Sequence, residues 1–99
     1  MGRSPRSTSL GLPATLATVQ AIRVLRLLAK RPLRFNRLKD ATGANAKSLS
    51  HALQVLAGDG CISRTVLVDG SPGVEYAVTA HGKRLLSIVD EIDRWAEAK

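Results

Sequence analysis

A group of polar and basic side chains follows Asn45 at helical spacing. Asn45 is a typical helix N-cap, and the predicted helix that follows, about Ala46 to Ala57, places Leu49, Leu53 and Leu56 on its inward side. The candidate contact residues on the outward side are Lys47, Ser48, Ser50, His51 and Gln54. Lysine can bind a phosphate or a guanine edge, serine either a phosphate or a base, and glutamine an adenine. Because the DNA major groove admits one α-helix, this face is typical of a helix that reads DNA.

The net charge of +7 is distributed unevenly along the 99 residues. Residues 1–39 hold nine basic residues and no acid, whereas residues 69–99 hold four bases and six acids. A one-sided basic field attracts polyanions, although it could also be a generic soluble surface. The further DNA-contact candidates outside the helix are Arg34, Arg37, Lys39, Asn45 itself, Arg64 and Ser71.

Two helices are predicted ahead of this one. The first runs from Pro13, a good first-turn residue, to about Lys30, before Pro32. Its polar arc consists of Thr15, Thr18, Arg23, Arg26 and Lys30. The second helix covers residues 34–42 and ends before Gly43. Its inward side is predicted to hold Phe35, Leu38 and Ala41.

The region after the third helix predicts a hairpin and a last helix. Strands from Cys61 to Val68 and from Val74 to Thr79 flank DGSPG, a run of turn-forming residues. Thr79 is a candidate N-cap for a helix from about Ala80 to Glu97. This order predicts an α+β winged helix-turn-helix fold: three helices, a two-stranded hairpin wing over about 61–79, and a C-terminal helix. We assign residues 12–99 to this one domain and residues 1–11 to a disordered arm.

The first and last helices carry more apolar surface than packing in a single small domain requires. About half of the circumference of the last helix is apolar. We therefore expect the two helices to form a homodimer interface, although deep burial in one chain is the alternative. The predicted interface residues are Leu16, Val19, Leu85, Ile88, Val89, Ile92 and Trp95.

The sequence offers little for catalysis or metal binding. One cysteine rules out an intramolecular disulfide and a multi-cysteine zinc site, and indicates a reducing, cytoplasmic setting. We interpret Cys61 as a small buried hydrophobe, and His51 and His81 are too few ligands for a metal. Phosphate-loop, paired-carboxylate and nucleophile motifs are missing. We therefore expect no enzyme activity, no cofactor and no metal, and no apolar run is long enough to cross a membrane.

Four stretches together carry a resemblance to a known family: RFNRL at 34–38, LSHAL at 49–53, DG at 59–60, and VEYAVT with a following glycine at 74–82. Over about residues 20–96 the chain resembles the winged-helix domain of the HxlR family of bacterial and archaeal transcription regulators, within the wider MarR-like group. The resemblance implies a cytoplasmic, homodimeric DNA-binding regulator that dimerises through its first and last helices. It also implies that the third helix and the wing contact double-stranded DNA.

The chain departs from the family pattern in three places. The cysteine that family members usually carry near the start of the domain, and that some use as a redox sensor, is missing, so we expect no thiol switch of that kind. Gly73 stands where the pattern tends to have a basic residue, so wing contact with the minor groove is expected to be weaker or made by backbone. The aromatic residue usual in the first helix is also missing.

Two other functions remain open at this point. Winged helices also serve as protein-docking modules, and a basic domain can bind DNA without sequence preference as an architectural protein. The basic outward face of the second and third helices favours sequence-specific DNA binding over docking. A small-molecule effector also remains open, with the groove between the first and last helices of a dimer as its expected place.

Overall fold

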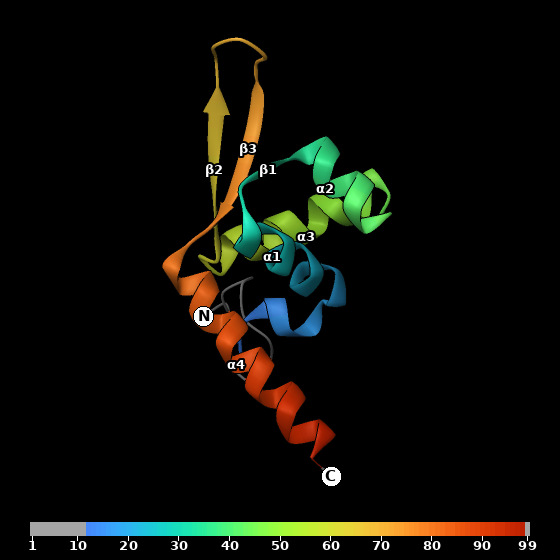
Figure 1. Ribbon diagram of the computed structural model, residues 1–99. Coiled ribbons are helices and arrows are strands. Elements are labelled where there is room, and N and C mark those ends of the chain that lie inside the picture. The colour runs from blue at the N-terminus through green and yellow to red at the C-terminus, as the bar shows by residue number, and fades with distance from the viewer. Residues whose placement is uncertain (1–11, 99) are drawn as a thin grey trace, which may run out of the picture.

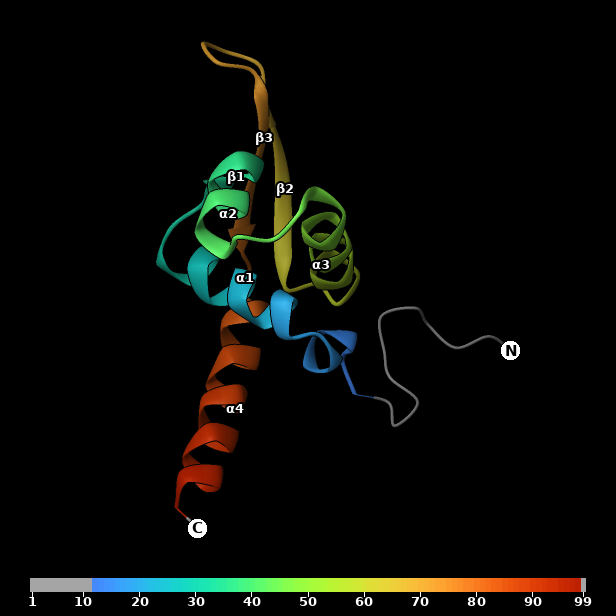
Figure 2. The same cartoon turned by 90° about the vertical axis from the view of Figure 1, so that its right-hand side faces the viewer.

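The structure, a computed structural model, describes residues 12–98, and the arm predicted over residues 1–11 lies outside it. Three helices form a core from which a hairpin and a long last helix project in opposite directions (Figures 1 and 2). The elements in chain order are η1 (Ala14–Ala17), α1 (Val19–Lys30), β1 (Leu33–Arg34), α2 (Phe35–Thr42), α3 (Ala46–Gly58), β2 (Ile62–Leu67), β3 (Gly73–Val78) and α4 (Ala80–Glu97). The predicted α+β winged helix-turn-helix fold is confirmed.

The helix-turn-helix link is closed by local hydrogen bonds. Gly43 ends α2 in the left-handed conformation, with φ of 71°, and its amide donates to the Lys39 carbonyl. A glycine adopts this conformation without a steric cost, which explains why the helix ends here. Asn45 then caps α3, as predicted, by accepting a hydrogen bond from the Ser48 amide at 2.8 Å. The end of α2 and the start of α3 are therefore both encoded within a few residues.

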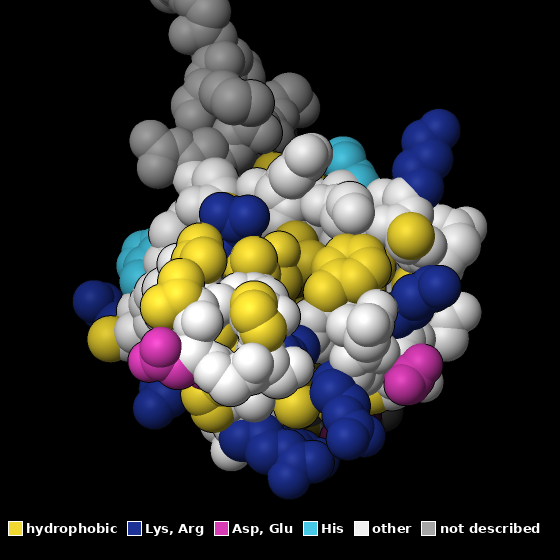
Figure 3. Space-filling view, turned by 90° about the horizontal axis from the view of Figure 1, so that it is seen from above, with side chains coloured by type: hydrophobic (Ala, Val, Ile, Leu, Met, Phe, Trp, Pro, Cys, Tyr) yellow, Lys and Arg dark blue, Asp and Glu magenta, His cyan; other side chains and the backbone are white. Residues whose placement is uncertain are grey.

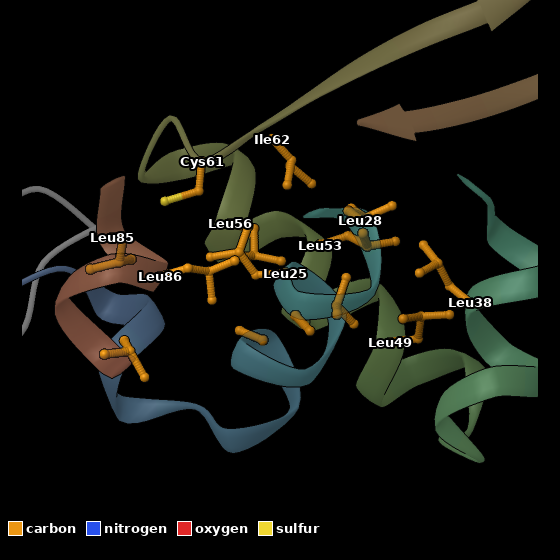
Figure 4. Packing of buried hydrophobic residues seen from close by; sticks show 14 residues of the cluster. Leu25, Leu28, Leu38, Leu49, Leu53, Leu56, Cys61, Ile62, Leu85 and Leu86 are labelled. Carbon is orange, nitrogen blue, oxygen red and sulfur yellow. The ribbon is translucent and has the colours of Figure 1, made fainter. Parts of the chain in front are cut away.

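Aliphatic side chains from all four α-helices and the base of the wing meet in one core (Figure 4). Its buried members are Ala21, Val24, Leu25, Leu28, Leu38, Leu49, Ala52, Leu53, Leu56, Cys61, Ile62, Leu85, Leu86 and Val89. The inward leucines of α3 are all among them, as predicted. Ala41, expected inward, is exposed, because each step of three residues turns a helix by about 60° and carries Ala41 away from the buried Leu38.

The hairpin belongs to a three-stranded antiparallel sheet with the order β1-β3-β2. The strand β1 is only two residues long and was not predicted. Arg31, which precedes Pro32, is extended, as residues before proline usually are. The chain therefore leaves α1 in an extended conformation and pairs Leu33 with Tyr76 and Arg34 with Glu75. A strand of two residues is too short to show an alternating pattern of apolar and polar residues, so only its pairing with β3 defines it.

The prediction of one continuous helix from Pro13 is wrong, because the chain breaks at Thr18. Thr18 is extended, with φ of −129° and ψ of 105°, and separates the short η1 from α1. Thr15, expected on the polar arc, is fully buried. Its amide and hydroxyl both donate to the Asp59 carboxylate, at 2.8 and 2.6 Å. This contact to a residue 44 positions away holds η1 against the end of α3.

The long helix α4 starts where the wing ends. The Thr79 hydroxyl accepts a hydrogen bond from the Gly82 amide at 3.1 Å and donates one to the Gly60 carbonyl at 2.7 Å. The predicted N-cap and the predicted bounds of this helix are confirmed. Gly82 is buried so tightly that an added Cβ would collide with the Cys61 carbonyl oxygen. The wing and α4 therefore share one closely packed junction.

Candidate nucleic-acid interface

The outward face of α3 is open to solvent along its length. All five side chains predicted there for DNA contact are exposed: Lys47, Ser48, Ser50, His51 and Gln54. The leucines behind them are buried, so the helix cannot rotate without exposing its core face. Asn45 is exposed as well, but its side-chain oxygen holds the Ser48 amide and therefore stabilises the start of the helix.

The second half of this face adjoins the wing. Ser50, Gln54 and Arg64 line a hollow of about 270 Å³ between α3 and the sheet, together with Leu53, Ala57 and Tyr76. Hydroxyl, amide and guanidinium groups in one hollow are a donor set suited to a phosphate group. Tyr76 was not predicted as a contact residue. Its cross-strand register with Arg64 brings it here, and that register cannot be read from the strand's composition.

The positive charges of this surface are not neutralised inside the chain. Within residues 12–98, Arg37, Lys39, Lys47 and Arg64 form no ion pair, and the two ion pairs present both involve Arg26. Seen from the wing end, Lys and Arg side chains are spread around the face and acidic side chains are sparse (Figure 3). Such unpaired, solvent-facing cations remain available to a polyanion.

Arg37 lies apart from the hollow between α3 and the wing. It lines a second, wider hollow of about 610 Å³ between α1 and α2, with Lys30, Arg31 and Asp40 on its rim. Sequence reasoning assigned Arg37 to the same interface as the third helix, and missed Arg31. The missing signal is spatial, because Pro32 turns the chain and places the end of α1 beside α2.

Arg34 reaches the wing from its position at the end of β1. Its Nη2 donates to the Ser71 carbonyl oxygen at 2.6 Å, and its Nη1 lies 3.4 Å from the Ser71 hydroxyl. The structure thus brings together two of the predicted contact residues, one from the start of α2 and one from the hairpin turn. Arg34 also lines a hollow with Pro72 and Gly73 of the hairpin turn.

Cys61 is buried at the start of the wing, as predicted. Burial raises the pKa of its thiol, the nearby Asp59 carboxylate raises that pKa further, and a hydrogen bond from Thr15 opposes them. A reactive thiol requires the opposite conditions, namely exposure and a lowered pKa. The side chain therefore serves packing between the wing, η1 and α4.

The predicted dimer residues divide into two groups. Leu85 and Val89 are buried in the core, and Leu16 packs against it, so these three stabilise the single chain. The outer stripe of α4 is open instead: Ile88, Ile92 and Trp95 are 51%, 49% and 72% exposed. Val19, at the start of α1, is exposed as well. In the single chain, these four apolar side chains are left open to solvent.

Metal ligands and membrane-spanning helices are two further features to consider. In residues 12–98, no group of three or more His, Cys, Asp or Glu side chains is arranged to hold a metal ion. The helices in this part of the chain are also too short or too polar to span a membrane.

The arrangement of α2, α3 and the three-stranded sheet defines a winged-helix protein of the helix-turn-helix class. The family model described as HxlR-like helix-turn-helix matches residues 19–99. The chain belongs to this family, which is one of helix-turn-helix proteins and not of enzymes.

Known proteins of this kind resemble the chain in sequence and in fold. An HTH-type transcriptional regulator of Halalkalibacterium halodurans, BH0655, itself uncharacterized, is 36% identical over 74 residues. That match covers 73% of this chain and 66% of the relative, just under two thirds of its length.

Two solved structures extend the comparison. A protein of Porphyromonas gingivalis W83 assigned to the MarR family of transcriptional regulators is 30% identical, with a TM-score of 0.70 over 83% of this chain and 81% of that one. The transcriptional regulator YodB of B. subtilis, in its reduced form, has a TM-score of 0.77 at 24% identity, over 85% and 83% of the two chains. The second likeness establishes the fold alone.

Proposed function

We propose that this protein is a homodimeric transcriptional regulator that binds double-stranded DNA in a sequence-specific manner. The recognition helix is α3, which enters the major groove, and the wing β2–β3 lies beside it. The observation that carries the proposal is the outward face of α3. It presents polar and basic side chains to solvent, backed by buried leucines and flanked by cations that form no ion pair within residues 12–98.

Each group of contacts has a distinct role in this proposal. Lys47, Ser48 and His51 lie in the first half of α3, where a recognition helix reaches base edges. Ser50, Gln54, Arg64 and Tyr76 line the hollow beside the wing, where a backbone phosphate fits. Lys39 and Arg37 on α2 supply charge for the flanking backbone, which accounts for much of the affinity of such proteins.

The homodimer forms through the exposed stripe of α4. Two chains that cover Ile88, Ile92 and Trp95 remove from water the large apolar side chains that α4 leaves exposed. Two recognition helices would then meet successive major grooves about 34 Å apart, on a roughly palindromic site. A small-molecule effector would act at the groove between α1 and α4, where a ligand can alter the spacing of the two helices. The proposed setting is cytoplasmic.

The test is a fluorescence-anisotropy titration with a duplex taken from upstream of the protein's own gene. A scrambled duplex of equal length and composition is titrated in parallel, both at several salt concentrations. Tight binding to the native duplex alone, weakening steeply as salt rises, is the expected result. Equal binding to both duplexes would favour a nonspecific architectural protein. No binding to either at moderate salt would favour the protein-docking module.

A further inference from the structure

The wing turn carries no positive charge of its own. Residues 69–73 are Asp-Gly-Ser-Pro-Gly, and the basic residue nearest to them in the sequence is Arg64 on β2. Asp69 at the tip repels phosphate. A wing that touches DNA with these residues alone would gain nothing from counterion release, the main source of affinity in such contacts.

We propose that Arg34 supplies the missing cation and at the same time braces the wing. This inference rests on the proposed function and assigns a further positioning role within the same interface. Arg34 stands at the boundary of β1 and α2, whose backbone is held by pairing with β3 on one side and by the buried Leu38 on the other. From this fixed base its side chain extends along the hairpin to Ser71.

The contacts of Arg34 hold the turn without using up the charge. The 2.6 Å bond to the Ser71 carbonyl is short, and the 3.4 Å contact to the hydroxyl is weak. Both acceptors are neutral, and Arg34 forms no ion pair within residues 12–98. A guanidinium group has five N–H donors, so three remain for a phosphate oxygen. The full positive charge therefore sits at the wing.

Gly73 makes room for this arrangement. A Cβ at this position would lie 3.1 Å from Nη1 of Arg34, tighter than most side-chain contacts, and 3.7 Å from Cζ, an ordinary van der Waals contact. The guanidinium thus lies directly against the backbone of the returning strand. A side chain at position 73 would require the Arg34 guanidinium to shift by a few tenths of an ångström, so the glycine leaves the room that the arginine occupies.

The experiment compares Arg34→Gln with Arg37→Gln. Both variants remove one positive charge from the start of α2, but Arg37 does not contact the wing. In the free protein, the {1H}–15N heteronuclear NOE of the Gly70, Ser71 and Gly73 amides reports the order of the turn. We expect a clear fall in Arg34→Gln and no change in Arg37→Gln. Unchanged values in both would overturn the brace.

DNA binding tests the charge. Arg34→Gln should weaken binding about tenfold and lower the slope of log affinity against log salt by about 0.9, one phosphate contact. Arg34→Lys keeps the charge but not the flat fork, so the slope should stay while the NOE falls. A slope unchanged in Arg34→Gln would overturn the phosphate contact. If the unsubstituted protein binds no duplex, the proposed function fails and the phosphate contact with it. The NOE values of the free protein would still show whether Arg34 orders the wing turn.

Discussion

The wing and α4 leave the core in opposite directions (Figure 1). An arginine ties each of them back to the core. Arg34 holds the wing through two neutral oxygens of Ser71. Arg26 holds α4 through two carboxylates, Asp90 at 2.8 Å and Asp93 at 3.2 Å. The same residue type therefore leaves a free positive charge at one end and a neutralised one at the other.

The two ends also differ in what they expose. The wing end presents basic and polar side chains beside the exposed Val66 and Val68, whereas the outer half of α4 presents Ile92 and Trp95 among acidic residues. A basic surface suits a polyanion, and an apolar stripe suits a second protein surface. The proposed function places DNA at one end and the partner chain at the other, and the following substitutions test that division.

The largest effect is expected from the double variant Ile92→Ser with Trp95→Ser. Removing the apolar stripe should yield monomers and weaken operator binding by about 100-fold or more, because two linked half-sites bind far more tightly than one. Sedimentation measures the mass and anisotropy the affinity. The matched control is Val66→Ser with Val68→Ser, which removes exposed apolar side chains from the wing end and should leave the dimer intact. A dimer that survives the first pair would place the interface elsewhere.

The close packing between the wing and α4 is tested by Gly82→Ala. The added methyl group would collide with the Cys61 carbonyl and the Val78 side chain, so the backbone must shift. We expect the free energy of unfolding to fall by about 2 kcal/mol, although alanine is the better helix former. Urea denaturation measures it. Ser87→Ala, an exposed change on the same helix, is the control, and equal stability of the two variants would argue against tight packing here.

Specificity at the DNA end is tested by Lys47→Ala with His51→Ala. Losing base contacts should reduce the ratio of operator to random-DNA affinity by about tenfold, since one good contact is worth about 1–3 kcal/mol. Lys83→Ala removes an exposed charge from α4 and should leave that ratio unchanged. A ratio unaffected by the double substitution would mean that α3 does not read the bases.

The smallest effect is expected from Arg26→Ala. Its ion pairs are about half exposed, and pairs of this kind contribute at most about 1 kcal/mol. Thermal unfolding should therefore change little, and the small difference should shrink at high salt. A fall in the free energy of unfolding of more than about 2 kcal/mol would show that Arg26 holds α4 more firmly than exposed ion pairs usually do.

Local signals in the sequence determined most of the fold. Asn45, Gly43 and Thr79 cap helices through bonds to residues at most four positions away, so α3, the end of α2 and the bounds of α4 were predictable. Leucine spacing showed which side of α3 is buried, and therefore which side chains are free for contact. The family resemblance was readable because its motifs are short runs of sequence, of which RFNRL lies at the start of α2 and LSHAL on α3.

Tertiary structure decided the features that depend on residues far apart. The break at Thr18 accompanies the bonds between Thr15 and Asp59, the two-residue β1 exists only by pairing with β3, and Tyr76 joins the interface through its register with Arg64. Arg34 could be recognised as a cation from the sequence, but its bond to Ser71 spans 37 residues. Periodicity and capping describe single elements, whereas these contacts form only when separate elements pack together.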